Sequence, residues 1–183
     1  SSKIIEESKE RKVVVFVQGD ALVQTTHSSL LLEARKHNIE TKIIHNASVL
    51  SAIGETGLHA QKFGPYVTIP FPEKTKGKLP ESIFEVIREN KKRGMHTLCL
   101  LDVVAEENKY MTIKEGLEIL SQGDVVDKND EVVAFAKSGS EKPLIIYNNV
   151  DELIGNDMRD IPAVLIIPGK LHFTEKEFLE TTK

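Results

Sequence analysis

A run of β-branched and aromatic residues, VVVFV, spans residues 13–17 and stops immediately before Gln18, Gly19 and Asp20. A strand that is buried on both faces of a parallel sheet reads as a continuous apolar run, so this segment predicts a buried strand. Ligands of open α/β sheets bind outside the carboxyl ends of the strands. Glycine lets the backbone approach a ligand closely, and Asp20 can accept hydrogen bonds from hydroxyl or ammonium groups. The sequence therefore predicts a small-molecule pocket at this strand end.

The first half of the chain alternates between strand-like and helix-like patterns. Such alternation predicts βαβ units and a parallel sheet. Asp20 and Asp102 each end a predicted strand, and they are either solvated turn residues or parts of a shared cleft. We predict helices at residues 4–11, 28–37, 49–54 and 81–93, and strands at 13–17, 41–44, 67–69 and 96–103.

The second half of the chain has a different character. Thr112 and Glu115 form the pattern of a capping box, which predicts a helix that begins at this point. Strands are predicted at 131–136, 144–147 and 164–167, with helices at 150–153 and 175–181. We therefore predict an α/β domain over residues 1–104 and an α+β domain over residues 105–183, with a ligand in the cleft between them.

The composition of the chain argues against several classes of function. The formal net charge of −4 argues against a dedicated nucleic-acid or membrane-surface binder, since such proteins usually carry a basic face. No apolar run approaches the roughly 20 residues that span a bilayer, and the polar start does not resemble a signal peptide. The single cysteine, Cys99, lies in an apolar run and is predicted to be a buried, unreactive thiol. A reducing, cytoplasmic compartment fits this cysteine usage.

The chain has no glycine-rich dinucleotide motif, no P-loop and no cysteine–histidine spacing typical of a metal site. His27, His45 and His172 lie at the ends of predicted elements, where each could face a pocket or serve a structural role. Ser48 is predicted to cap the helix that follows it, and a helix N-terminus can also bind anions.

Several long segments carry a resemblance to a known family. They are GDALVQTTH (19–27), IIHNASVLSAIGETGL (43–58), KFG, VTIPFP, PESIFEVIRENKKRGMHTLCLLDV (80–103), YMT, AKSGSEKP (136–143) and IIPGKLHF (166–173). Together they resemble the diphthine synthases, which are S-adenosylmethionine-dependent methyltransferases of diphthamide biosynthesis with a tetrapyrrole-methylase-like fold. The resemblance implies a Rossmann-like parallel-sheet N-terminal domain and a mixed-sheet α+β C-terminal domain.

This resemblance implies an activity. Methyl groups pass from S-adenosylmethionine to the amino group of a modified histidine on translation elongation factor 2, and S-adenosylhomocysteine is the product. The leaving group is a neutral thioether, so positioning and desolvation are expected to do most of the catalysis. We expect neither a nucleophile nor a metal, and the catalytic residues stay unassigned. The family also implies a cytoplasmic homodimer that binds no nucleic acid and no membrane.

The family's cofactor contacts carry over by motif to seven positions. Two departures accompany them: Ala21 replaces a family proline, and the family's first strand, which ends in a Gly-Leu-Gly turn, has no counterpart here. The sheet is therefore expected to lack a central strand. The alternatives are a related tetrapyrrole-type methyltransferase and a non-catalytic, truncated fragment that binds a partner. The predicted cofactor contacts are Asp20, Val23, Ser48, Val49, Leu101, Ser138 and Val164.

Overall fold

The computed structural model describes residues 2–77, 79–156 and 158–183. Backbone contacts divide the chain into two compact units, Ser1–Ala52 and Ile53–Lys183, which we call the N-terminal unit and the C-terminal unit. The predicted domain boundary at 104/105 differs from this division and stays a prediction.

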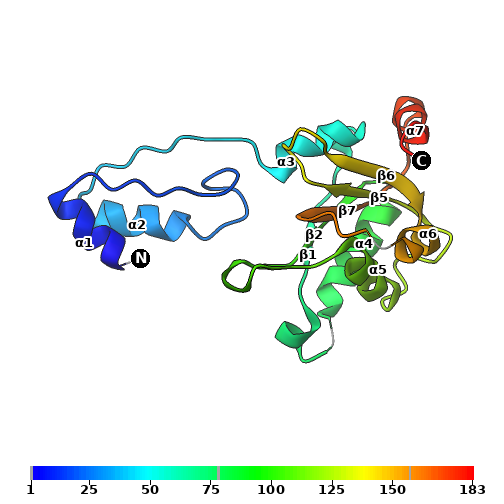
Figure 1. Ribbon diagram of the computed structural model, residues 1–183, viewed down its shortest axis with the longest axis horizontal. Helices are drawn as coiled ribbons and strands as arrows, with labels where there is room; N and C mark the ends of the chain where they lie inside the picture. Colours follow the sequence, from blue (N-terminus) through cyan, green and yellow to red (C-terminus); the bar gives the residue numbers. More distant parts are fainter. Residues whose placement is uncertain (1, 78, 157) are drawn as a thin grey trace. The chain divides into compact units, whose positions relative to one another are not determined.

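Residues 2–52 of the N-terminal unit form three helices, α1 (Ser2–Glu10), α2 (Ser28–Lys36) and α3 (Val49–Ala52), which are joined by extended segments (Figure 1). The predicted strands at 13–17 and 41–44 are wrong, because both segments lack strand pairing. Their apolar side chains are largely exposed: Phe16 is 94% and Ile44 79% accessible to solvent. A strand requires a neighbour for its backbone N–H and C=O groups, and no strand is formed within residues 2–52.

The C-terminal unit is built on a five-stranded mixed sheet in the order β1-β2-β7-β5-β6. The neighbours β1 and β2 are parallel and are connected through helix α4 (Glu81–Lys92), whereas the other neighbouring pairs are antiparallel. A mixed α/β sheet of this kind confirms the predicted fold class. The strands are β1 (Val67–Ile69), β2 (Thr97–Leu101), β5 (Glu131–Ala136), β6 (Leu144–Asn149) and β7 (Ala163–Ile167).

Four helices accompany this sheet in the described part of the C-terminal unit, and a local sequence signal explains where one of them begins. Thr112 caps α5 (Ile113–Ser121), and the reciprocal bonds between Thr112 and Glu115 confirm the predicted capping box. A short hairpin, β3 (Val103–Val104) and β4 (Lys109–Tyr110), follows strand β2. The helices are α4 (Glu81–Lys92), α5 (Ile113–Ser121), α6 (Val150–Gly155) and α7 (Phe173–Glu180), and short 3₁₀ turns cover Ile53–Thr56, Ala60–Lys62, Pro72–Thr75 and Ala105–Glu107.

The core of the C-terminal unit occupies both faces of the sheet. On one face, Cys99 and Leu165 pack in the same cluster as Ile87 of α4 and Leu117 of α5. On the other face, the alternate residue Leu98 is also buried. Figure 1 shows α4 and α5 below the sheet in that view, with α7 above it. The sheet is thereby a rigid support for the residues at its edges.

Candidate functional site

The loop at Asp20 is fixed by three hydrogen bonds to one carboxylate. Asp20 Oδ1 accepts from the Leu22 N–H at 2.9 Å, and Oδ2 accepts from the Asn46 N–H at 3.2 Å. Oδ2 also lies 2.8 Å from Nδ1 of His45. Only 6% of Asp20 is exposed, although the segment before it is open to solvent. The carboxylate therefore joins two loops, residues 19–22 and 45–46, that are far apart in the sequence.

The electrostatics of this contact keep Asp20 ionised. The Leu22 N–H bond lowers the pKa of the Asp20 carboxyl most, and the His45 bond lowers it further against the opposing effect of burial. Because a carboxylate can only accept, Nδ1 of His45 carries the proton in this bond. The His45 side chain is 68% exposed, so most of the ring faces solvent.

Ser48 lies directly after this loop, and its predicted capping role is confirmed. Its hydroxyl accepts from the Leu50 N–H at 3.2 Å. The helix that it caps, α3, has only four residues, too few for a substantial dipole, so the capping role is the one that the structure supports. Val23 and Val49 are both half-buried on the same unit.

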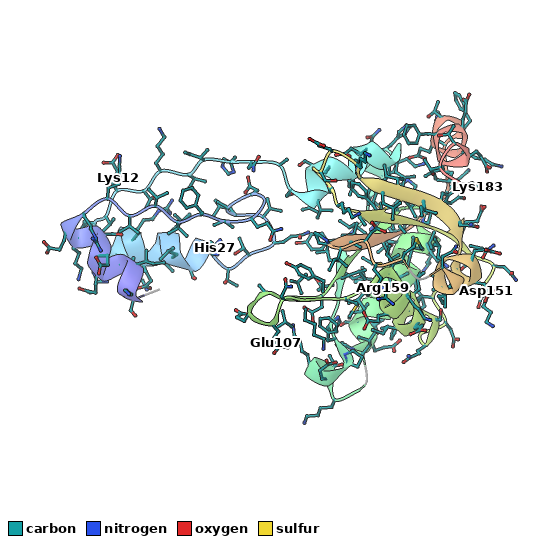
Figure 2. All side chains as sticks on the ribbon, in the orientation of Figure 1. Lys12, His27, Glu107, Asp151, Arg159 and Lys183 are labelled. Atoms are coloured by element: carbon teal, nitrogen blue, oxygen red, sulfur yellow. The ribbon has the colours of Figure 1, made fainter. Side chains whose placement is uncertain are left out.

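His27 contacts the same loop from the start of α2. Its Nδ1 lies 3.0 Å from the carbonyl oxygen of Ala21, which makes Nδ1 the donor. Figure 2 labels His27 at this helix end. The structure thus places two of the three histidines that sequence analysis singled out, His27 and His45, against residues 19–22.

Three predicted site residues gather at one edge of the C-terminal sheet. Val164 pairs with Leu100 of β2 on one side and with Phe135 of β5 on the other. Leu101 ends β2, and both Leu101 and Val164 are buried. Ser138 is exposed in the turn that follows β5. Since β7 runs antiparallel to both neighbours, the ends of β2 and β5 lie at the same edge as the start of β7.

Asp102 follows Leu101 and has a structural role at the carboxyl end of β2. Its carboxylate accepts from the Phe71 N–H at 2.9 Å and lies 2.8 Å from Nζ of Lys74. Burial would raise the pKa of Asp102, but the Lys74 and Phe71 contacts outweigh it and lower the pKa below its ordinary range. These bonds tie the end of β1 to the end of β2. A cleft shared with Asp20 stays a prediction.

A buried cluster around Glu175 was missed by sequence analysis. Glu175 and His96 are both fully buried, with His96 Nε2 3.1 Å from Glu175 Oε1. His96 Nδ1 accepts from the Gly169 N–H at 2.9 Å, so Nε2 is the protonated nitrogen. Burial lowers the pKa of His96 despite its carboxylate neighbour. His96 is therefore bonded to two residues that are distant in the sequence, and no spacing in the sequence reveals these contacts.

Glu175 receives three further donors from two segments, the short turn at residues 59–62 and the start of α7. The His59 N–H donates to Oε1 at 2.8 Å, the His172 N–H donates to Oε2 at 2.6 Å, and Lys62 Nζ also donates to Oε2. His172 belongs to the capping box of α7, which gives this histidine a structural role. The cluster fixes the amino end of β2, whereas the predicted site residue Leu101 lies at its carboxyl end.

Cys99 lies in β2 and is fully buried. Burial raises the pKa of the Cys99 thiol to about 12, which confirms a buried, unreactive cysteine. Across the described residues, no group of three or more histidine, cysteine, aspartate or glutamate side chains is arranged to hold a metal ion. No helix in the same part of the chain is long and apolar enough to cross a membrane.

Comparison with known proteins places this fold and sequence in a family. The family model of tetrapyrrole (corrin/porphyrin) methylases matches residues 2–154. The diphthine synthase of Methanocaldococcus jannaschii is 41% identical over 97% of this chain and 72% of its own length. The diphthine synthase of Methanococcus maripaludis strain S2 is 40% identical over 98% of this chain and 72% of its own length.

Solved structures agree with the sequence comparison. A crystal structure of diphthine synthase superposes with a TM-score of 0.87 at 33% identity, covering 99% of this chain and 69% of that one. A conserved protein of Aeropyrum pernix K1 superposes with a TM-score of 0.81 at 26% identity, over 99% of this chain and 67% of that one. The chain therefore belongs to the tetrapyrrole methylase family and, within it, to the diphthine synthases, the S-adenosylmethionine-dependent methyltransferases of diphthamide biosynthesis.

Proposed function

We propose that this chain methylates the amino group of a modified histidine on translation elongation factor 2, with S-adenosylmethionine as methyl donor and S-adenosylhomocysteine as product. The observation that carries the proposal is the match to diphthine synthases over 97% of the chain at 41% identity. S-adenosylmethionine is consumed as a substrate and supplies an electrophilic methyl group on a sulfonium.

The seven residues that match family contacts are proposed to bind this donor. Their chemistry suits it, because adenine and the thioether need apolar walls while the ribose and the amino acid part need polar partners. Asp20 already accepts three hydrogen bonds, and a carboxylate has about four acceptor positions, so capacity for one ligand contact is left. The apolar members are Val23, Val49, Leu101 and Val164, and the polar members are Asp20, Ser48 and Ser138.

Calorimetry with S-adenosylhomocysteine tests donor binding directly. We expect the wild-type chain to bind it, and Asp20→Ala to weaken binding at least tenfold, because that change removes the carboxylate and loosens the loop at residues 45–46. Asp151→Ala is the matched control: it removes an exposed carboxylate from α6 (Figure 2) and is expected to leave binding unchanged. Absence of binding by the wild-type chain, or equal affinities of the wild type and Asp20→Ala, would refute the donor site.

Transfer of a radiolabelled methyl group tests the acceptor. We expect label on elongation factor 2 that carries the unmethylated precursor side chain, and none on elongation factor 2 with an unmodified histidine. Label on a corrin or porphyrin precursor instead would favour the related tetrapyrrole-type activity. Donor binding without transfer to any of these acceptors would favour a non-catalytic, partner-binding role.

We further propose that the protein acts in the cytoplasm as a homodimer, as the family resemblance implies. Sedimentation equilibrium of the purified chain tests the assembly, with twice the chain mass as the expected result. A single-chain mass at micromolar concentration would refute the dimer. Fractionation of cells that express the chain tests the compartment.

A further inference from the structure

We propose that His45 accepts the proton that the acceptor amine must lose, and that Asp20 holds the His45 imidazole in the orientation for this step. The proposal rests on the proposed function above and assigns a catalytic base that the family match leaves open. It is carried by the geometry of the Asp20–His45 pair in the N-terminal unit.

The pair has the arrangement that a carboxylate-oriented base requires. His45 Nδ1 lies 2.8 Å from Asp20 Oδ2, so the bond fixes which nitrogen is protonated and leaves Nε2 as the acceptor. Asp20 is itself locked by the backbone N–H groups of Leu22 and Asn46. The carboxylate is 6% exposed, whereas the imidazole is 68% exposed. The buried carboxylate of Asp20 therefore orients the solvent-exposed imidazole of His45.

The position of His45 in the chain also suits this role. It lies three residues before Ser48, in the loop that precedes two proposed donor contacts, Ser48 and Val49. Its partner Asp20 is a third proposed donor contact. His45 therefore shares its loop and its hydrogen-bond partner with residues that are proposed to contact the donor.

Amine methylation needs such a base for a simple reason. An alkyl ammonium is protonated at neutral pH and has no lone pair, so a proton must leave nitrogen before attack. In the proposed step the ammonium gives that proton to Nε2 of His45, and the nitrogen lone pair forms a bond to the methyl carbon. The carbon–sulfur bond breaks, its electron pair stays on sulfur as a neutral thioether, and the imidazolium returns its proton to water. Asp20 stabilises the imidazolium that forms, as the carboxylate does in hydrolase triads.

His27 is the competing candidate, and its surroundings suit the step less. Its Nδ1 bonds to the carbonyl oxygen of Ala21, a neutral acceptor, which stabilises an imidazolium less than a carboxylate does. Within the described residues of the N-terminal unit, Asp20 is the ionisable side chain found in contact with His45. The two histidines therefore form a natural pair for comparison.

The first test reads the tautomer of His45 in the ligand-free protein and requires no activity. Nitrogen-15 NMR of histidine-labelled chain should show His45 protonated on Nδ1 and unprotonated on Nε2 in its neutral form. Asp20→Asn should shift His45 toward the mixture that exposed imidazoles show, and His37, at the exposed end of α2, supplies that reference signal. A neutral His45 protonated on Nε2 would overturn the proposal.

The second test is single-turnover methyl transfer to elongation factor 2, with donor affinity measured alongside. We expect His45→Gln to slow transfer by at least about a hundredfold, a typical contribution of general base catalysis, and to bind S-adenosylhomocysteine within about threefold of wild type. The pH–rate profile should lose one ionisation, and added imidazole should partly restore His45→Ala. His37→Gln is the control and should behave as wild type.

These outcomes separate the inference from the proposed function. A wild-type chain that binds the donor but does not methylate elongation factor 2 would refute the proposed function, and this step with it. Active wild type with an equally fast His45→Gln would overturn the base assignment alone. Loss of donor binding in His45→Gln, or a loss of transfer in His27→Ala that added imidazole restores, would likewise overturn it.

Discussion

Replacing Glu175 by glutamine should destabilise the protein by an amount that the pKa of this carboxyl sets. Glu175 is fully buried and accepts from four donors: two backbone N–H groups, Lys62 Nζ and His96 Nε2. A glutamine has the same shape but only one acceptor oxygen, so its NH₂ group would face two of these donors. Glu175→Gln therefore removes the negative charge and places the NH₂ group of the glutamine against groups that can only donate hydrogen bonds.

The magnitude follows from the pKa shift. Burial alone would raise the pKa of Glu175, but the His172 N–H, Lys62 and the remaining donors outweigh it and lower the pKa from 4.5 to about 2. At about 1.4 kcal/mol per pKa unit, this shift corresponds to about 3 kcal/mol of folding free energy. Because the folded-state pKa is the lower one, this stability is fully present above pH 4.5 and is lost as pH falls toward 2.

Urea unfolding at several pH values measures this effect. At pH 7, we expect Glu175→Gln to lower the free energy of unfolding by about 3 kcal/mol, within the range for breaking a buried ion pair. The difference from wild type should shrink as pH falls from 4.5 toward 2. Glu177→Gln, which removes an exposed carboxylate from the same helix, should change stability by under about 0.5 kcal/mol. A Glu175→Gln loss that is equally small, or one independent of pH, would refute the reasoning.

Two further predictions concern packing in the C-terminal unit. Gly169→Ala would place a Cβ 2.5 Å from backbone atoms of Gly94 and Met95, so it should lower the free energy of unfolding in urea by about 1–3 kcal/mol. The control is Gly54→Ala, which should be close to neutral because its Cβ would have no neighbour within 4 Å. Equal effects of the two changes would contradict the close contact at Gly169. Cys99, with a pKa of about 12 and no exposed surface, should react with a thiol reagent only as fast as the protein unfolds, and rapid labelling of the native protein would disprove its burial.

Local signals explain most of what the sequence predicted correctly. The Thr112–Glu115 capping box is a contact within one helical turn, and it forms as expected. The apolar segments at 67–69 and 131–136 become β1 and β5, because each finds a hydrogen-bonded neighbour in the sheet. Composition and motif spacing therefore predict an element correctly where it depends on residues close in sequence. They also predict strands correctly where the partner strands are present.

The errors come from non-local requirements. Residues 13–17 have the composition of a buried strand, yet they form none, because composition describes what a segment prefers within a sheet and does not provide the neighbouring strand. The Glu175 cluster is a non-local feature that sequence analysis missed. His96 and Glu175 lie 79 residues apart, and only the folded sheet brings them within 3.1 Å.

The Asp20 loop depends on both local and non-local contacts. It has a defined geometry although the segments beside it form no strand. Its shape depends on one carboxylate and three donors, of which the Leu22 N–H is local and those of His45 and Asn46 are distant in sequence. Strand pairing at 13–17 and 41–44 is therefore not a condition for the Asp20–His45 contact. Sequence analysis found both residues through their motifs but treated Asp20 as a ligand contact. The structure adds that Asp20 first organises its own loop, and this internal role is what makes His45 a candidate base.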